Sequence, residues 1–285
     1  DYLSGSVEGT VGTYGLKQFK GTISGPLLGD TVTGRLSVSG TWRDGNLRNT
    51  VTGLRQNAQE NKGVRGQIKI KPNDRLTIKL NGDYTSQQPE CCTQVYVRTG
   101  LTQRPANTQY ANLAAGIGYK PPSANPFDYL ADVNDDIQAD QWVSGLSGIV
   151  EYDFGPVTLT SVSAHREWDW EPRNDRDYTA LAVTTKSANP SHQKQTSQEF
   201  RLSSNGRNTL DWTVGLYYFD QNVTTHGVTA YGKDASYWLL PGTNSPSWLL
   251  DGFAVFNDSS IDTTSYAAFG QVDWKSAENF KLTAG

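Results

Sequence analysis

The chain has 285 residues, with 25 lysines and arginines against 29 aspartates and glutamates, and its net charge is −4. This balance argues against nucleic acid or an anionic membrane surface as a partner, because both need a basic field. Mean hydropathy is −0.57. No stretch approaches the ~18 apolar residues of a membrane-spanning helix, which excludes a helical membrane protein. A transmembrane barrel stays possible, because each barrel strand needs only about 10 residues, half of them apolar.

Apolar and polar residues alternate along most of the chain. Residues 64–71 read VRGQIKIK and residues 75–84 read RLTIKLNGDY. A period of two predicts β-strands, because successive side chains of a strand point to opposite faces. In chain order we expect about eleven strands, which cover residues 3–11, 19–25, 32–42, 64–71, 75–84, 142–154, 157–168, 199–202, 210–218 and 266–274 and resume near 280.

The strand predicted at 157–168 has a less regular pattern than the others. Val157 and Leu159 are in one phase, whereas Val162 and Ala164 are in the other. A β-bulge adds one residue to a strand and would account for this change of phase.

After a first short turn at Tyr14-Gly15, short and long connections alternate. Tight turns are predicted at 28–30, 72–74, 155–156, 205–208 and 276–278, and long loops at about 44–61, 86–140, 169–194 and 223–262. All tight turns therefore fall at one end of the strands and all long loops at the other. Outer-membrane barrels have this asymmetry, with short periplasmic turns and long extracellular loops. Long structureless loops are uncommon in a compact soluble domain.

Aromatic residues lie near both ends of the apolar strand faces. The loop ends carry Trp42, Tyr84, Trp142, Tyr218 and Tyr266, and the turn ends carry Tyr152, Phe154, Trp212 and Trp274. Trp and Tyr prefer the headgroup region on each side of a bilayer. The nine residues therefore predict two membrane girdles around a band that faces lipid. The core of a soluble sandwich would instead scatter its aromatic residues along the strands. The charged opposite faces fit a hydrated lumen and a soluble sandwich equally.

Several segments resemble the barrel of TonB-dependent outer-membrane receptors. They are GSVEGTVGTYG at 5–15, SGPL at 24–27, RLSVS at 35–39, WRDGN at 42–46, QEFRLS at 198–203, DWTVGLYY at 211–218 and SYAAFGQVDW at 265–274. The resemblance implies an all-β fold, an antiparallel up-and-down transmembrane β-barrel of about 22 strands around a lumen filled by an N-terminal plug domain. We therefore expect residues 1–285 to form a partial barrel domain, about half of the strands, with the plug absent from this chain.

The resemblance also implies a function for the parent protein. It would bind a scarce large solute (a siderophore, cobalamin or an oligosaccharide) at its extracellular loops and import it across the bacterial outer membrane. Energy would come from the TonB–ExbB–ExbD complex through the plug. Outer-membrane lipid would be the other partner, and neither an enzymatic activity nor a cofactor is expected. The sequence agrees, since its three histidines are isolated and no nucleophile-elbow or phosphate-binding loop occurs.

Other readings of the sequence stay open. One is a passive porin-like channel. A second is a soluble β-rich module that binds or hydrolyses carbohydrate, although no pair of carboxylates stands out for that chemistry. A third is a surface adhesin or phage receptor.

Aromatic residues in or beside the predicted loops are the candidate ligand contacts, because flat rings suit sugars and siderophore rings. They are Trp168, Trp170, Tyr178, Tyr237, Trp238 and Trp248. The same rings are equally able to pack one loop against another. An anionic ligand would suit the arginines at 166, 173 and 176, but the acidic residues at 169, 171, 175 and 177 are interleaved with them. We expect these acids to neutralise the arginines.

No metal site is expected. Cys91 and Cys92 are adjacent and have no ligand partner at metal spacing, so they are either exposed thiols or a vicinal disulfide. The sequence Asp132-x-Asn134-x-Asp136 resembles the opening of a calcium loop, but it lacks the glycine at the sixth position and the glutamate at the twelfth. A solvated acidic loop is the expected structure there.

Overall fold

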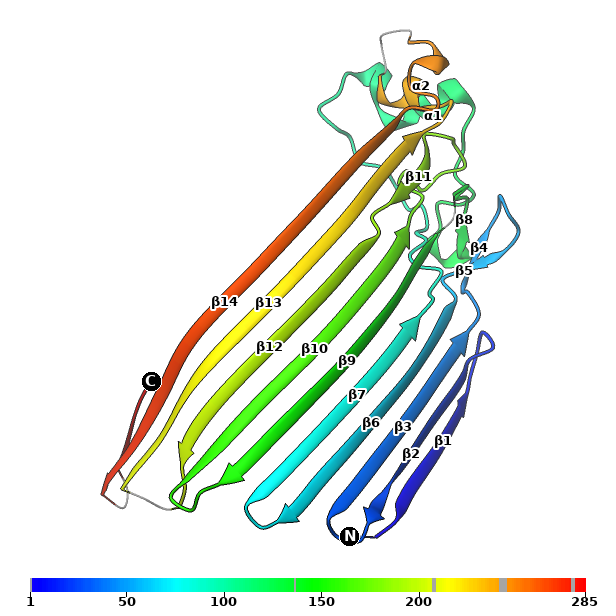
Figure 1. The fold of residues 1–285 in the computed structure, drawn as a ribbon. Helices are drawn as coiled ribbons and strands as arrows, with labels where there is room; N and C mark the ends of the chain where they lie inside the picture. Colours follow the sequence, from blue (N-terminus) through cyan, green and yellow to red (C-terminus); the bar gives the residue numbers. More distant parts are fainter. Residues whose placement is uncertain (1, 136, 207–208, 241–244, 278–279) are drawn as a thin grey trace.

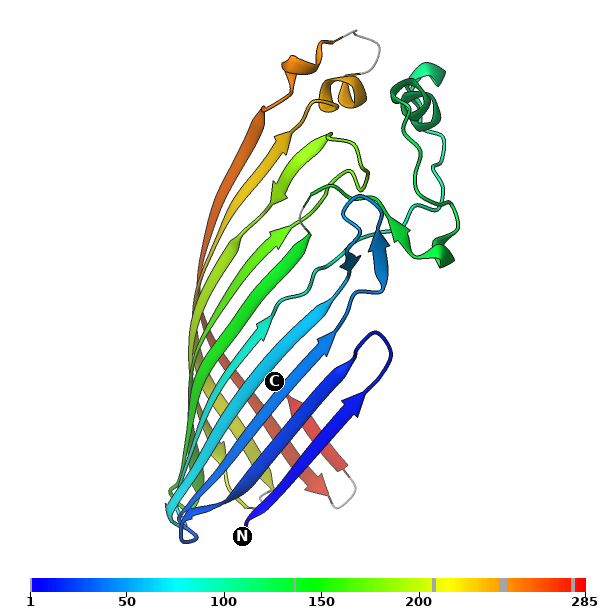
Figure 2. The same cartoon turned by 90° about the vertical axis from the view of Figure 1, so that its right-hand side faces the viewer.

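The computed structural model describes residues 2–135, 137–206, 209–240, 245–277 and 280–285. Within them, long antiparallel strands form one curved sheet (Figures 1 and 2). The strands are β1 (Ser4–Val11), β2 (Lys17–Leu28), β3 (Val32–Arg43), β6 (Gln59–Asn73), β7 (Leu76–Gln87), β9 (Gln138–Asp153), β10 (Val157–Arg173), β12 (Ser191–Ser204), β13 (Leu210–Tyr231), β14 (Ala254–Ala277) and β15 (Phe280–Ala284). This arrangement confirms the predicted all-β partial barrel.

Each long strand between the edge strands β1 and β15 pairs with the long strand before it and the long strand after it in the chain. The tight turns at 28–30, 72–74 and 155–156 lie together at the lower end of Figure 1 and the long connections lie at the upper end, as predicted. We call these the turn end and the loop end. Residues 207–208 and 278 of the other two predicted turns lie outside the described residues. The sheet order runs from β1 to β15 without the two strands pairing with each other. The described strands therefore form an open trough with a convex outer face and a concave inner face (Figure 2).

The connections at the loop end contain the remaining elements. A small sheet joins β4 (Leu47–Asn49), β5 (Arg55–Gln56) and β8 (Leu130–Ala131), and β11 (Thr184–Ala188) pairs with β10 and β13 above β12. The helices are α1 (Tyr110–Ile117), α2 (Ala235–Leu239), η1 (Ala106–Thr108), η2 (Pro126–Asp128) and η3 (Ser247–Leu249). None of the described helices has the length and hydropathy required to cross a membrane.

The strand register places the apolar residues on the outer face. Directly opposed residues of an antiparallel pair share a face. Tyr84 opposes Ser144, and Trp142 lies two residues from Ser144 on the same face. The rings of Tyr84 and Trp142 stack with their centroids 6.3 Å apart. At the same end Tyr218 opposes Tyr266, with ring centroids 5.2 Å apart. At the turn end the rings of Tyr152 and Phe154 lie 4.6 Å apart.

No second sheet of the described residues packs on this apolar face, because the small sheet lies among the loops. Trp42 is 38% exposed and Trp274 is 48% exposed. The described residues therefore do not form the sandwich core that would bury these rings in a soluble module.

The inner face is polar and carries cross-strand ion pairs. Lys79 lies 3.0 Å from Glu151, Arg166 lies 2.7 Å from Asp83, and Lys275 lies 2.6 Å from Asp211. Within each pair the two opposite charges neutralise each other. The concave face is therefore polar, as the wall of a hydrated lumen is.

Two predicted loops are shorter in the structure than expected. The predicted loop 169–194 begins inside β10, which continues to Arg173, and the predicted loop 223–262 is reduced by β13, which continues to Tyr231, and by β14, which begins at Ala254. The reason is that most residues of these strand extensions are polar, and their few apolar residues are not confined to one face. Hydrogen bonding between the strands therefore continues beyond the point where the hydropathy alternation ends.

The bulge expected in the strand at 157–168 is also wrong. The pairing of β10 with both β9 and β12 runs without a register shift from Thr158 to Trp170. Val162 and Ala164 consequently face inward, whereas Ser161, Ser163 and His165 face outward. The change of phase in the sequence is a real change in the polarity of the outer face.

Candidate ligand-binding site

Two of the predicted ligand-contact residues lie on the inner face of β10 near its loop end. Trp170 is a strand residue, not the loop residue that was expected. The indoles of Trp168 and Trp170 stack at 5.8 Å with an angle of 20° between the ring planes, and Trp168 Nε1 donates to Gln141 Oε1 at 3.1 Å. The hydrogen bond fixes the first ring, and both side chains stay half-exposed. The pair forms an aromatic platform at the mouth of the trough.

The long connections at the loop end fold into a cap with its own core. In Figure 2 the segment with α1 lies on the right, above the concave side of the sheet. Val133 and Asn49 are both fully buried, and Asn49 Nδ2 donates to the carbonyl oxygen of Val133 at 2.8 Å. The backbone N–H of Thr50 also donates to Ala131 at 2.7 Å. These bonds join two connections that are far apart in the sequence.

Tyr237 and Trp238 of α2 pack against the segment that carries α1. Tyr237 Oη donates to the carbonyl oxygen of Leu113 at 3.1 Å, and the ring of Trp238 meets the edge of Tyr110 at 5.6 Å. Gly116 lies directly beneath the hydroxyl of Tyr237, where a Cβ would collide. These contacts support loop packing as the role of the two residues.

The other two candidate aromatic residues have different surroundings. Trp248 in η3 is 73% exposed. Tyr178 has a left-handed backbone, with φ of 53°, and its N–H donates to Asp175 Oδ1 at 2.9 Å. The structure thus brings Trp168 together with Trp170, and Tyr237 together with Trp238, into two separate clusters.

The segment between β10 and β11 is held in place by carboxylates. Asp175 is fully buried and accepts from the backbone N–H groups of Asn134 (2.9 Å), Asp177 (3.2 Å) and Tyr178 (2.9 Å). Because Asn134 belongs to the connection before β9, this one side chain ties two loops together.

Two further carboxylates bind the same segment. Asp132 accepts from Tyr119 Oη at 2.7 Å and from the N–H of Ala180 at 3.3 Å, and Asp234 accepts from the N–H of Ala182 at 2.8 Å. Burial raises the pKa of Asp132. Asp132 is therefore buried and hydrogen-bonded, which corrects the expectation of a solvated acidic loop. Asp136 of the same motif lies outside the described residues.

The interleaved acids of this region do not neutralise the arginines as expected. Arg166 pairs with Asp83, and Arg176 donates to Thr229 Oγ1 at 3.3 Å. Asp177 accepts from Thr184, while Asp175 is used by backbone N–H groups. Asp175 and Asp177 therefore hold backbone segments in place and do not act as counter-charges for the arginines.

Among the residues that the structure describes, no group of three or more His, Cys, Asp or Glu side chains is placed to hold a metal ion. Cys91 and Cys92 form a vicinal disulfide with each other, one of the two expected arrangements.

The cap should loosen as pH rises. Burial and the nearby charge of Asp177 raise the pKa of Asp175 to about 7, above the ~3.9 of an unfolded aspartate. A group whose pKa is raised on folding gives its full stabilisation below the unfolded pKa and loses it as pH rises through the folded value. We expect amide exchange at Asn134 and Tyr178 to accelerate between about pH 4 and about pH 7 beyond its intrinsic dependence. Asp175→Asn should abolish that excess, and an identical excess in the variant would contradict the assignment.

No protein-family model matches the chain, and no curated protein matches it significantly. Solved structures do. The ferric yersiniabactin uptake receptor FyuA from Yersinia pestis has a TM-score of 0.70 at 14% identity, and the match covers 99% of this chain and 38% of that receptor. The open form of the ferric-catecholate import receptor Fiu from E. coli K12 has a TM-score of 0.64 at 15% identity, covering 99% and 43%.

A third match is the outer-membrane ferripyoverdine receptor of Pseudomonas aeruginosa bound to ferripyoverdine, with a TM-score of 0.61 at 10% identity, covering 99% and 36%. The chain thus spans less than half of the length of each of these receptors. Almost every residue of the chain takes part in each match. The chain therefore has the fold of part of these receptors, a partial antiparallel β-barrel.

Proposed function

We propose that the parent protein is an outer-membrane receptor that imports a scarce large solute with energy delivered by TonB. The observation that carries this proposal is that the two faces of the sheet differ in polarity and that the long connections gather at one end of the strands. An apolar, aromatic-bordered outer face suits lipid, a polar inner face suits a hydrated lumen, and a packed cap stands over the mouth. The matched receptors import ferric siderophores or bind a ferric siderophore, as their names state. A solute of that class is our first candidate, ahead of cobalamin and oligosaccharides.

In this proposal the turn end faces the periplasm and the loop end faces the medium. Solute would meet the cap first and the Trp168–Trp170 platform next, while the TonB–ExbB–ExbD complex acts through a plug domain that lies outside this chain. No catalytic step is required, since import changes the position of the solute and not its bonds.

Uptake of radiolabelled solute tests the proposal. Cells that lack the intact gene should lose high-affinity uptake of one candidate solute, and the restored gene should return it. Removal of TonB should abolish this uptake as well. Uptake that persists without TonB would favour the passive porin-like channel, and unchanged uptake of every candidate after gene deletion would contradict import altogether.

The aromatic platform makes a separate prediction about binding. We expect Trp168→Ala or Trp170→Ala to weaken solute binding by about 2 kcal/mol, or about thirtyfold in Kd, because stacked aromatic anchors dominate such contacts. Equilibrium binding to intact cells measures the effect. Phe256→Ala is the matched control, since Phe256 is a 74% exposed aromatic residue on β14, away from the inner face. Equal affinities for the wild type and both tryptophan variants would remove the platform from the site.

A further inference from the structure

Two neighbouring hollows lie on the inner face of β2, β3, β6 and β7. The hollow nearer the turn end has a volume of about 480 Å³ and the hollow nearer the loop end about 440 Å³. Cations line both of them: Arg35, Lys69 and Lys79 in the first, and Lys20, Arg65 and Arg166 in the second. Of the carboxylates that the structure describes, Asp83 lines the second hollow and none lines the first. We call these six basic residues the cationic track.

The cationic track has more positive than negative charge. Arg35, Arg65 and Lys69 are exposed, and none of them takes part in an ion pair or hydrogen bond within the described part of the chain. The other three cations are paired at 3.4, 3.0 and 2.7 Å with the carboxylates of Glu8, Glu151 and Asp83. Six cations therefore meet three carboxylates, and half of the cations have no counter-charge.

The strand register concentrates this excess. Asp83 directly opposes Arg65, but both of its carboxylate oxygens accept from Arg166 Nη2, at 2.8 and 2.7 Å. Lys69 directly opposes Lys79, and like charges in directly opposed positions destabilise a sheet. Proteins keep such unfavourable local arrangements mainly at functional sites. The opposed lysines therefore point to an anionic group that offsets their repulsion.

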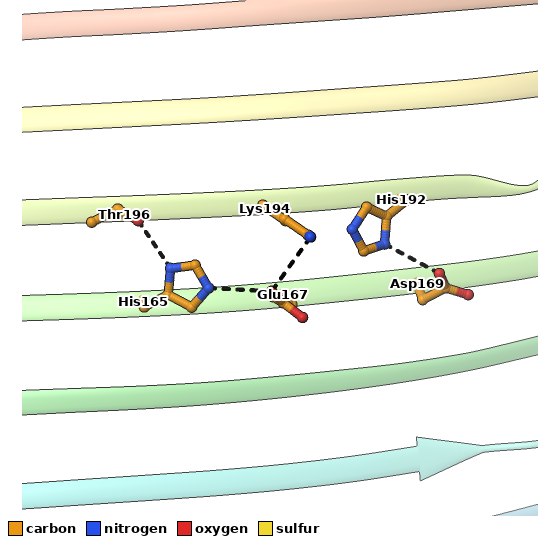
Figure 3. Close-up of polar contacts among 6 residues, drawn as sticks. All are labelled: His165, Glu167, Asp169, His192, Lys194 and Thr196. Atoms are coloured by element: carbon orange, nitrogen blue, oxygen red, sulfur yellow. Dashed lines mark hydrogen bonds and ion pairs between the residues drawn. The ribbon is translucent and has the colours of Figure 1, made fainter.

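Basic side chains on the outer face of the same sheet are arranged differently. Figure 3 shows Lys194 and His192 of β12 beside carboxylates of β10, with Lys194 Nζ 3.9 Å from Glu167 Oε1 and His192 Nδ1 3.2 Å from Asp169 Oδ2. His165 also lies 3.4 Å from Glu167. These outward basic groups have partners within the chain, so the unpaired cations of the inner face are not a general property of the sheet.

The cationic track continues from the aromatic platform toward the turn end. Arg166 lies two residues from Trp168 and shares its inward face on β10. The ion pair of Arg166 with Asp83 leads to Arg65, which directly opposes that aspartate on β6. Lys69 lies four residues further along β6 toward the turn end. A solute that leaves the platform for the turn end therefore meets cations in succession.

Cations in series suit the passage of an anion. Pores for anions and phosphate are lined by Arg and Lys, and passage needs several sites, each strong enough to admit the ion and weak enough to release it. A cleft lined by one sign of charge also concentrates the opposite ion. Arginine in particular binds carboxylate and phosphate groups through paired donors.

We propose that the cationic track guides a negatively charged solute from the aromatic platform to the turn end. This inference deepens the proposed function and rests on it, because it assigns a negative charge to the imported solute. An acidic face of the plug domain could meet the same cations. A fixed contact of that kind requires only one patch, whereas the track extends over two hollows and adjoins the platform.

Binding of a small anion to the purified full-length protein tests the track. Benzene tricarboxylate is a flat trianion, and benzene tricarboxamide is its uncharged analogue of similar shape. By calorimetry we expect the wild type to bind the tricarboxylate in preference to the tricarboxamide. The variant Arg35→Gln/Arg65→Gln/Lys69→Gln should bind the tricarboxylate with a Kd about tenfold higher or more, because three charge-assisted contacts are lost.

The matched control removes the same charge from the outer face. Three lysines point outward in the strand register, namely Lys62, Lys186 and Lys194. Their combined replacement by Gln should leave tricarboxylate binding unchanged. The charge-preserving variant Arg35→Lys/Arg65→Lys/Lys69→Arg should keep most of the binding, which separates a lost charge from a misfolded wall.

Three results of the binding experiment would overturn the proposal. They are no binding of the tricarboxylate to the wild type, equal binding of the two probes, and equal Kd values for the wild type and the variant with three Gln replacements. Carbodiimide coupling of Lys69 to a carboxylate of the plug domain, identified by mass spectrometry, would assign the track to a fixed plug contact instead.

Uptake by cells separates failure of the track from failure of the proposed function. An iron(III) tris-catecholate chelate is negatively charged, whereas an iron(III) tris-hydroxamate chelate is neutral. We expect TonB-dependent uptake of the charged chelate and its loss in the variant with three Gln replacements. Preferred TonB-dependent uptake of any uncharged solute contradicts the track alone. Absence of TonB-dependent uptake for every candidate contradicts the proposed function and the track with it.

Discussion

Val214→Lys is expected to prevent assembly of the protein in the outer membrane. Val214 faces outward on β13 between Trp212 and Tyr218, opposite Leu202 on one side and Gly270 on the other. An ammonium group at the middle of a lipid-facing band costs about 2–4 kcal/mol, a large part of the stability of a typical protein. Heat-modifiable migration on gels and the amount of protein in the outer-membrane fraction measure the effect.

The neighbouring substitution Thr213→Lys is the matched control. Thr213 faces the polar inner wall, where its hydroxyl lies 3.0 Å from Ser203 Oγ. The same charge one residue away should therefore be tolerated, with the loss of one hydrogen bond worth about 1 kcal/mol. Equal assembly of the two variants would mean that the two faces of β13 do not differ in the solvent that they meet.

Asp175→Ala is expected to unfold part of the cap while the barrel strands stay intact. The substitution removes the acceptor of three backbone N–H groups, which belong to Asn134, Asp177 and Tyr178. Because the carboxylate site is fully buried, water does not replace the acceptor without opening the loops. A cost of about 3 kcal/mol is expected from the unsatisfied groups. Protease added to whole cells should then cleave the connection before β9 or the segment before β11.

Asp251→Ala serves as the control for that experiment, since Asp251 is an exposed residue of the connection between α2 and β14. It should leave the protease resistance unchanged. Resistance of Asp175→Ala equal to that of the wild type would show that Asp175 does not hold the two loops together.

The sequence alone predicts the strands and their order because the lipid-facing side of a barrel imposes a period of two. Val64, Ile68, Ile78 and Leu80 all follow this rule and all lie on the outer face. The alternation of short and long connections follows from the same up-and-down order and is confirmed. The strand ends are not predictable in this way, because beyond Tyr218 and Tyr266 the outer face is mostly polar while the backbone pairing continues to Ala230 and Ala254.

β10 and the cap show where sequence reasoning fails. The phase change on β10 indicates a bulge only if every strand has an apolar outer face, yet Ser161 and Ser163 face outward with the register intact. The cap depends on contacts between residues far apart in the chain, such as Asn49 with Val133, which no local pattern reveals. Asp175 carried one available signal, an acidic residue in a short segment rich in turn-forming side chains, and that signal also fits a surface charge.

Accessibility of spin labels along β13 in lipid vesicles tests most directly whether hydrocarbon covers the outer face. Labels on the full-length protein at Trp212, Val214 and Leu216 should collide preferentially with oxygen, which concentrates in the bilayer, and labels at Thr213 and Gly215 with a water-soluble paramagnetic chelate. If hydrocarbon covers the outer face, this alternation is expected at every position from Trp212 to Leu216. Outward positions that are open to the chelate, or shielded from both reagents, would contradict it.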